Sequence, residues 1–479
     1  MTGAALAAQI TVSGPIAGAP RLGLGQFDLK SLGYVTEEYF LSGTATAYKR
    51  VGQPGEDGRW TAAPATTSPY VTRIVVVRPS DPAKFNGTVV VEWLNVTGGL
   101  DAPADWIVTH REMIRGGYAF VGVSAQRVGI EGGPSLMAGM PLKKADPARY
   151  GQLSHPGDAF AYDLYSQAGR VVRGEGSEGV LGPLRPKRVL SIGESQSAVF
   201  LTTYVNAIDP IAKVYDGFLI HSRFGGASTI EGAAFQGESA SDLALAVKLR
   251  EDLRAPVITV ITETDLIGGQ LTGFFPAQQP DNARLRIWEI PGTSHADTYI
   301  FSASGIDSGS APIEALAAAL KPTKDVFGTT LAFPMNSAPQ HHYIVEAALW
   351  SLDRWVRTGE APPKAPRVKA ALGDKPSDPA KLTLDANGIA EGGVRTPWVD
   401  VPTARMSGVG NSGGALGFLL GVTEPFDQAK LDSLYPGGKA EYLKKFNASL
   451  TDAIASGFIL PADKAEIEAL GAAMYPGSK

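Results

Sequence analysis

Short hydrophobic runs recur along the first two thirds of the chain. They are found at residues 72–77 (TRIVVV), 88–93 (TVVVEW), 117–124 (GYAFVGVS), 189–192 (VLSI), 214–220 (VYDGFLI), 255–261 (APVITVI) and 284–290 (RLRIWEI). Many of their residues are β-branched, and the run at 88–93 shows no alternation of polar and apolar positions. Such runs are typical of strands buried on both faces of a parallel sheet.

Helix-like stretches separate several of these runs. Residues 104–115 and 160–173 have apolar positions at helical spacing, and another helical stretch begins after Ser197. Strands that alternate with helices in this way predict an α/β fold with a doubly wound, mostly parallel sheet. Residues 127–150 are rich in Gly, Pro and Lys and are expected to form a long loop.

The pattern divides the chain into three parts. Residues 1–70 are expected to form an N-terminal β-like segment, and residues 71–357 an α/β core with cap insertions at about 223–250 and 296–340. The core ends in a strongly amphipathic helix at 341–357. Residues 358–479 are β-like and then largely helical, and are expected to form a C-terminal extension that packs on the core. A cap or extension over a site would shape its pocket and exclude water.

Composition narrows the class of protein. The chain has 479 residues, of which 44% are hydrophobic and 19% charged, as in ordinary soluble globular proteins. A net charge of −5 without a basic cluster argues against nucleic acid as a partner. No apolar run reaches the roughly 18 residues that span a bilayer. The lack of cysteine excludes disulfides, thiolate metal sites and a cysteine nucleophile.

The most informative stretch is residues 188–200, reading RVLSIGESQSAVF. A buried strand is predicted to end near Gly193, and a helix to begin after Ser197. Between them stands G-x-S-x-G with its last Gly replaced by Ser197. In a nucleophile elbow, the central serine lies on a sharp strand-to-helix turn that exposes its hydroxyl at the top of a sheet. Ser195 is therefore a candidate nucleophile, and an ordinary turn with a surface serine is the alternative.

A serine nucleophile needs a base, and the base needs an orienting carboxylate. Asp265 and His295 follow two later predicted strands, so that Ser195, Asp265 and His295 occur in the order serine, acid, histidine. Each follows the carboxyl end of a strand, where open parallel sheets bind their ligands. Glu263 stands two residues before Asp265 and is an alternative acid.

The other histidines fit the role of the base less well. His221 follows the strand after the nucleophile, and we expect it to be able to line the pocket, but it precedes the acid in the sequence. His341 and His342 begin the amphipathic helix and lack the carboxylate or cysteine spacing of a metal-binding motif, so we expect no metal site there. Phosphate-binding motifs are missing. We therefore predict no cofactor.

The loop at residues 94–99 (LNVTGG) follows an early strand. A glycine-bearing loop at this place can aim a backbone N–H at a developing oxyanion. A plain strand-to-helix loop is the alternative.

Taken together, these stretches resemble the α/β-hydrolase superfamily, and in particular a bacterial family of long α/β-hydrolase domain proteins whose substrates are largely unassigned. The matching residues are 91–96 (VEWLNV), 193–197 (GESQS), 262–265 (TETD), 292–295 (GTSH) and 392–397 (GGVRTP). The resemblance implies Ser195 as nucleophile, Asp265 as acid and His295 as base. It also implies oxyanion-binding amides from Gln196 and from the Asn95–Val96 loop.

The expected activity is hydrolysis of carboxylic esters, lactones included, by a serine hydrolase whose partner is a small to medium, hydrophobic ester. An acyltransferase with the same triad and a non-catalytic binding protein on a hydrolase scaffold are the alternatives. A monomer and a homo-oligomer both remain open. The first ten residues lack a basic region. They fit a cytoplasmic protein, and equally a secreted or periplasmic one whose signal peptide is absent.

Overall fold

The computed structural model describes residues 10–175, 179–232, 246–326, 328–373 and 378–476. Within these residues, nine strands form one sheet in the order β1-β2-β3-β5-β4-β6-β7-β8-β9. The strands are β1 (Thr11–Ser13), β2 (Tyr34–Arg50), β3 (Ala62–Pro79), β4 (Thr88–Trp93), β5 (Ala119–Val123), β6 (Arg188–Glu194), β7 (Gly217–His221), β8 (Val257–Thr262) and β9 (Leu285–Ile290).

The strands from β5 to β9 run parallel to one another, and β1, β2 and β3 form an antiparallel edge. Every residue of β4, β5, β7, β8 and β9 is buried, which explains why these strands are mostly hydrophobic and show no regular alternation of polar and apolar residues. The mostly parallel α/β sheet predicted from the sequence is confirmed. The run at 72–77 is the last part of the much longer β3, which pairs with β2 along nearly its whole length.

Helices cover both faces of the sheet. On one face α1 (Ala104–Arg115) packs beside α10 (Gln340–Thr358), and on the other lie α5 (Ala161–Val172) and α6 (Gln196–Thr203). Each face has its own large hydrophobic core. Because both faces are covered, the carboxyl edge of the parallel strands is the place where polar side chains can meet a ligand.

Residues 127–150 are not the uninterrupted loop expected from their Gly and Pro content. They contain the short helices α2 (Arg127–Glu131), α3 (Leu142–Ala145) and α4 (Pro147–Tyr150). Apolar side chains of this segment pack with Phe40 of β2 and form a small core of their own. Tertiary burial therefore overrides the weak local propensity of the segment.

Residues 296–340 contain η6 (Tyr299–Ala303), α9 (Ile313–Ala319), β10 (Asp325–Val326) and β11 (Thr329–Thr330). Of the segment 223–250, residues 233–245 lie outside the described residues. Another short helix, α7 (Asp209–Ala212), continues the chain after α6, and α8 (Glu263–Ile267) follows β8.

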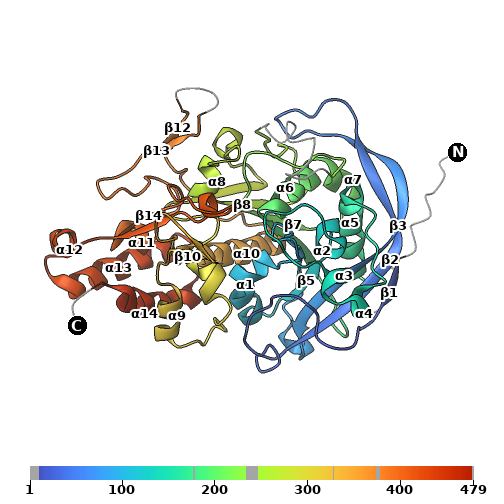
Figure 1. Ribbon diagram of the computed structural model, residues 1–479, viewed down its shortest axis with the longest axis horizontal. Coiled ribbons are helices and arrows are strands. Elements are labelled where there is room, and N and C mark those ends of the chain that lie inside the picture. The colour runs from blue at the N-terminus through green and yellow to red at the C-terminus, as the bar shows by residue number, and fades with distance from the viewer. Residues whose placement is uncertain (1–9, 176–178, 233–245, 327, 374–377, 477–479) are drawn as a thin grey trace.

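The last part of the chain lies at one end of the molecule, opposite the long β2–β3 hairpin (Figure 1). It contains β12 (Ala370–Ala371), β13 (Lys381–Leu382), α11 (Pro397–Asp400), β14 (Ala404–Ser407), β15 (Val422–Pro425), α12 (Gln428–Leu434), α13 (Gly438–Ala455) and α14 (Lys464–Met474). α14 packs on α9 and α13. Apolar residues of α13 and α14 belong to the same core as α1 and α10. None of the helices in the described ranges is long and apolar enough to cross a bilayer.

Candidate active site

The turn between β6 and α6 holds Ser195 in a conformation that is rare for a residue with a side chain. Its φ is 58° and its ψ −118°, and its N–H donates to the carbonyl oxygen of His221 at 3.0 Å. Such a conformation persists only where surrounding contacts hold it. A Cβ on Gly193 would come within 3.1 Å of the Ser197 Cβ. Because Gly193 has no side chain, Ser197 fits where the motif usually has glycine.

Three side chains from three strand ends form one hydrogen-bonded row. Ser195 Oγ lies 2.8 Å from His295 Nε2, and His295 Nδ1 lies 2.6 Å from Asp265 Oδ1. All three residues are buried, with Ser195 at 8% exposed and Asp265 at 0%. Since Nδ1 faces a carboxylate, it carries the proton, and Nε2 is left to accept the Ser195 hydroxyl proton.

The Asp265 carboxylate is anchored from behind. Its Oδ2 accepts the backbone N–H of Thr262 at 2.9 Å and the Thr262 hydroxyl at 2.7 Å. Burial alone would raise the pKa of Asp265, but the His295 imidazole and the Thr262 hydrogen bonds outweigh it and hold the pKa below its usual value. Burial lowers the pKa of His295, while Asp265 and Glu194 raise it, and the net direction is upward.

Glu263, the alternative acid, points elsewhere. Its Oε1 accepts the Gly292 N–H at 2.5 Å, and its Oε2 accepts the Ser407 hydroxyl and the Gly408 N–H, both at 2.8 Å. It therefore joins the loop before His295 to the chain after β14, and it makes no hydrogen bond to the imidazole. Of the two acids, the structure brings only Asp265 to His295.

The two predicted oxyanion loops meet beside Ser195, but they do not contribute equally. The Asn95 N–H donates to the Ala102 carbonyl oxygen at 2.9 Å, and the Thr97 N–H donates to Asn95 Oδ1 at 2.8 Å. Among the described residues, no acceptor takes the N–H of Val96 or of Gln196. Val96 and Gln196 are thus the amides free to bind a ligand oxygen, and the Asn95 N–H is not.

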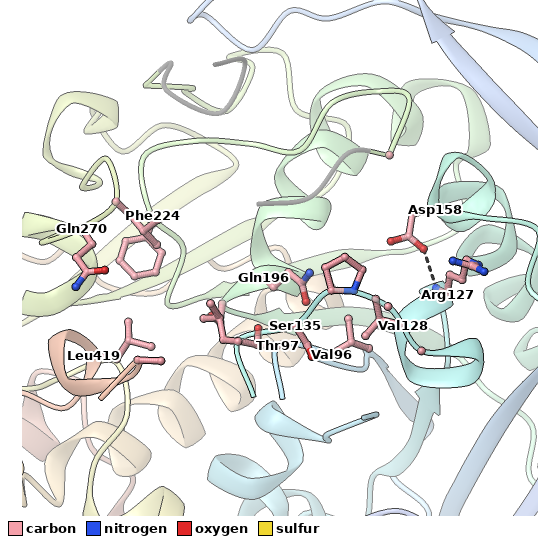
Figure 2. Close-up of a pocket in the computed structure, with 18 of the residues that line it drawn as sticks. Val96, Thr97, Arg127, Val128, Ser135, Asp158, Gln196, Phe224, Gln270 and Leu419 are labelled. Carbon is pink, nitrogen blue, oxygen red and sulfur yellow. Dashed lines mark hydrogen bonds between the residues drawn. The ribbon is translucent and has the colours of Figure 1, made fainter. Parts of the chain in front are cut away.

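A cavity of about 450 Å³ opens above Ser195, within the size range of small-molecule sites. Figure 2 shows Phe224 and Leu419 at one end, Asp158 and Arg127 at the other, and Gln196 between them. Most of its wall is apolar, from Val96, Val128, Leu136, Phe224, Leu271, Phe418 and Leu419. Leu419 belongs to the C-terminal part of the chain, so that this part forms one wall of the cavity.

A second buried row of hydrogen-bonded side chains lies behind the site, and no sequence pattern predicted it. His221 Nδ1 lies 2.9 Å from Asp105 Oδ1, its Nε2 lies 2.9 Å from His341 Nε2, and His341 Nδ1 lies 3.0 Å from Asp297 Oδ2. His221 is fully buried and does not line the cavity, contrary to expectation. Two facing Nε2 atoms at this distance must share one proton, which fixes the end of β7 against α1 and α10.

The neighbouring His342 lies near two carboxylates, Asp307 and Glu466, that are far from it in the sequence. The guanidinium of Arg111 already pairs with both, at 3.2 Å from Asp307 Oδ2 and in direct contact with Glu466. A cation therefore balances these acids from within the chain, and we assign no metal ion to the group.

Comparison with solved structures gives distant likenesses only. A thermostable esterase from Pseudomonas putida is 14% identical over 50% of this chain and 66% of its own length, with a TM-score of 0.27. This chain thus spans slightly less than two thirds of that esterase. A protein described as a dienelactone hydrolase from Klebsiella pneumoniae is 12% identical over 58% of this chain and 95% of its own, with a TM-score of 0.27. A structure from a study of fungal esterases from Rhizomucor miehei is 12% identical over 54% of this chain and 77% of its own length, with a TM-score of 0.29.

No curated protein matches the sequence. A family model described as "Alpha/beta hydrolase domain" matches residues 7–469. Together with the mostly parallel sheet and its covering helices, this match confirms both the predicted fold class and the predicted resemblance. Because the family model spans nearly the whole sequence, the chain belongs to the alpha/beta hydrolase domain family.

Proposed function

We propose that this protein is a serine hydrolase of carboxylic esters, lactones included, that acts through an acyl-enzyme. The observation that supports the proposal is the continuous row from Asp265 through His295 to Ser195, which ends at the floor of a mostly apolar cavity. A hydroxyl within 2.8 Å of an oriented imidazole is the arrangement that activates a serine nucleophile.

In the first half-reaction, His295 Nε2 takes the proton of Ser195 Oγ as this oxygen attacks the ester carbonyl carbon. His295 then gives the proton to the leaving alkoxide, and the C–O bond breaks to leave an acyl group on Ser195. In the second half-reaction, His295 takes a proton from water as the water oxygen attacks the acyl carbon. The bond between this carbon and Ser195 Oγ then breaks, His295 returns the proton to Oγ, and the carboxylic acid leaves. Asp265 keeps the imidazole in the required tautomer and stabilises its cation.

The oxyanion that forms in each half-reaction needs donors on the face opposite the base. The N–H groups of Val96 and Gln196 fit this role, because no acceptor among the described residues takes them and both residues line the cavity. Losing one such donor typically lowers kcat about 10²–10³-fold.

The substrate should be small to medium in size and largely hydrophobic. Apolar side chains form most of the cavity wall, and such walls bind ligands by removing apolar surface from water.

The test is Ser195→Ala with p-nitrophenyl butyrate as substrate. We expect hydrolysis to fall at least about a thousandfold, since the remaining groups give only residual catalysis. The variant should keep its fold, because the Ser195 side chain makes its only described hydrogen bond with His295.

A fluorophosphonate probe supplies a measurement independent of turnover. It should label the wild-type protein at Ser195 and leave Ser195→Ala unlabelled. Near-native turnover by the alanine variant would contradict the proposal, and so would a folded wild-type protein that neither reacts with the probe nor cleaves esters of graded acyl length.

A further inference from the structure

A second carboxyl group lies against the catalytic imidazole. Glu194 Oε1 is 3.3 Å from His295 Nε2, the same nitrogen that lies 2.8 Å from Ser195 Oγ. The Glu194 side chain is only 10% exposed, so this contact is largely shielded from solvent. The imidazole of His295 is therefore flanked by carboxyl groups on both nitrogens, Asp265 at Nδ1 and Glu194 at Nε2.

The position of Glu194 is fixed by Asn95. Asn95 Oδ1 accepts the Thr97 N–H at 2.8 Å, so the Asn95 Nδ2 group must face the other way. There it donates to Glu194 Oε2 and to the Glu194 carbonyl oxygen, both at 3.1 Å. Because Oε2 is held by Asn95, the second oxygen, Oε1, stays directed at His295.

A carboxyl group in this position competes with Ser195. If Glu194 is protonated, its O–H points at the Nε2 lone pair that must accept the serine proton. If Glu194 is ionised and the proton lies on Nε2, the imidazole is already a cation and accepts nothing. With one proton between the two groups, the base is occupied whichever atom carries it.

We propose, on the basis of the serine-hydrolase function above, that Glu194 and His295 share one proton and that Ser195 becomes reactive only when this proton leaves. Glu194 is then a positioning residue, because it acts on Ser195 through His295. Once the proton has gone to solvent water, Nε2 is free to take the serine proton. The ionised Glu194 then stabilises the imidazolium that forms.

The surroundings of Glu194 favour retention of the proton. Burial raises the pKa of Glu194 to about 8, with His295 and His341 opposing and Asp105 and Asp265 adding to the rise. Glu92 of β4 is a further buried acid in electrostatic contact with Glu194. Acids on α1, α8 and β4 therefore raise the pKa of Glu194, and His295 and His341 oppose this rise. His221 is its neighbour on β7.

The test compares the pH dependence of kcat/KM in wild type, Glu194→Gln and Glu194→Met. In wild type, activity should reach half its maximum near the pKa of about 8. Both variants lack the titratable shared proton, so the pH profile should change in both. In Glu194→Met the half-maximal pH should be lower by about one unit or more, the usual effect of removing an adjacent carboxylate. In Glu194→Gln the amide oxygen accepts from Asn95 and the amide N–H faces Nε2, so activity should stay low with no step near pH 8. Glu251→Gln, which removes a surface charge, should leave the profile unchanged.

The rate of Ser195 labelling by a fluorophosphonate, measured against pH, should move in the same way and does not depend on turnover. The proposal would be overturned if a folded Glu194→Gln or Glu194→Met variant kept the wild-type midpoint in both the activity and the labelling profiles against pH. This failure is distinct from failure of the proposed function, in which wild type cleaves no ester at any pH or Ser195→Ala stays active. If both variants fail to fold, the titration of His295 in wild type can be followed by NMR instead. Ring signals that change in a single step, with no change near pH 8, would overturn the proposal equally.

Discussion

Glu263 and Asp265 show how two carboxylates that are two residues apart come to do different work. Both follow β8, but the Thr262 cap turns Asp265 toward His295. The Glu263 carboxylate points away from His295 and accepts hydrogen bonds from the backbone N–H groups of Gly292 and Gly408. Asp265 is therefore hydrogen-bonded to the proposed base, and Glu263 joins two loops.

Asp265→Asn should therefore lower kcat by about 10⁴-fold with little change in fold, because an amide favours the wrong imidazole tautomer. Glu263→Gln should instead lower the free energy of unfolding by about 1–3 kcal/mol, because one of its oxygens becomes a donor that faces other donors. Its kcat should fall less than about tenfold.

Steady-state kinetics and urea unfolding on both variants separate the two roles. The assignment is wrong if Glu263→Gln loses activity as severely as Asp265→Asn while it remains equally stable.

At this scale, the sequence was informative about the reacting groups and uninformative about their neighbours. Ser195, Asp265 and His295 could be proposed because each follows a hydrophobic run in a known order. The contact between Glu194 and His295 joins residues about a hundred positions apart, and no local sequence pattern predicts it.

Among the elements, α10 carries two adjacent histidines that face different surroundings. The predicted start at His341 is within one residue of the observed start at Gln340. His341 binds His221 and Asp297. His342 is 1% exposed and stacks on Tyr299, and neither of its ring nitrogens has a hydrogen-bond partner among the described residues.

Replacing His342 by Phe should stabilise the protein by about 1–3 kcal/mol, because it removes an unsatisfied buried polar ring and keeps the stacking. Burial, with Arg111 and His341 adding to it, holds the pKa of His342 well below 6.5. The unfolded chain thus binds more protons than the folded one below pH 6.5. The contribution of His342 to the free energy of unfolding is therefore complete above that pH and is lost as the pH falls.

His342→Phe should therefore lose less stability than wild type between pH 7.5 and 5.5, measured by urea unfolding. His341→Phe is the matched control and should be destabilising, because it leaves His221 and Asp297 without their partner. A His342→Phe variant that is clearly less stable at pH 7.5 would reveal a polar partner of His342 and contradict this prediction.

At the scale of the whole molecule, the C-terminal extension packs against the loops that carry the proposed acid and base. Gly408, after β14, lies between the loops that carry Asp265 and His295. A Cβ there would come within 2.3 Å of the Thr293 carbonyl oxygen and 2.6 Å of the Thr264 N. The Thr264 hydroxyl donates to the Gly408 carbonyl oxygen. The acid loop, the histidine loop and the extension are thus packed as one unit.

Gly408→Ala should push these loops apart and lower kcat/KM about 10²-fold, since a displacement near 1 Å between reacting groups has effects of this size. Gly23→Ala, where a Cβ meets nothing within 4 Å, should behave as wild type in the same ester assay. Full activity in a folded Gly408→Ala variant would show that the two loops tolerate separation.

The parallel strands of the core could be predicted because burial on both faces leaves a strong hydrophobic signal. The role of residues 404–425 could not be predicted from the sequence, because this segment is polar and glycine-rich. Their function depends on where the fold places them, against Glu263 and above Ser195.

The late position of this wall has a consequence for biosynthesis. A ribosome that has reached residue 400 has already supplied the proposed nucleophile, base and acid, Ser195, His295 and Asp265. The chamber that receives a substrate, however, still lacks the side formed by Phe418 and Leu419. A nascent or prematurely ended polypeptide would hold all the proposed reacting groups without a closed chamber, so we expect turnover only after Phe418 and Leu419 have been added.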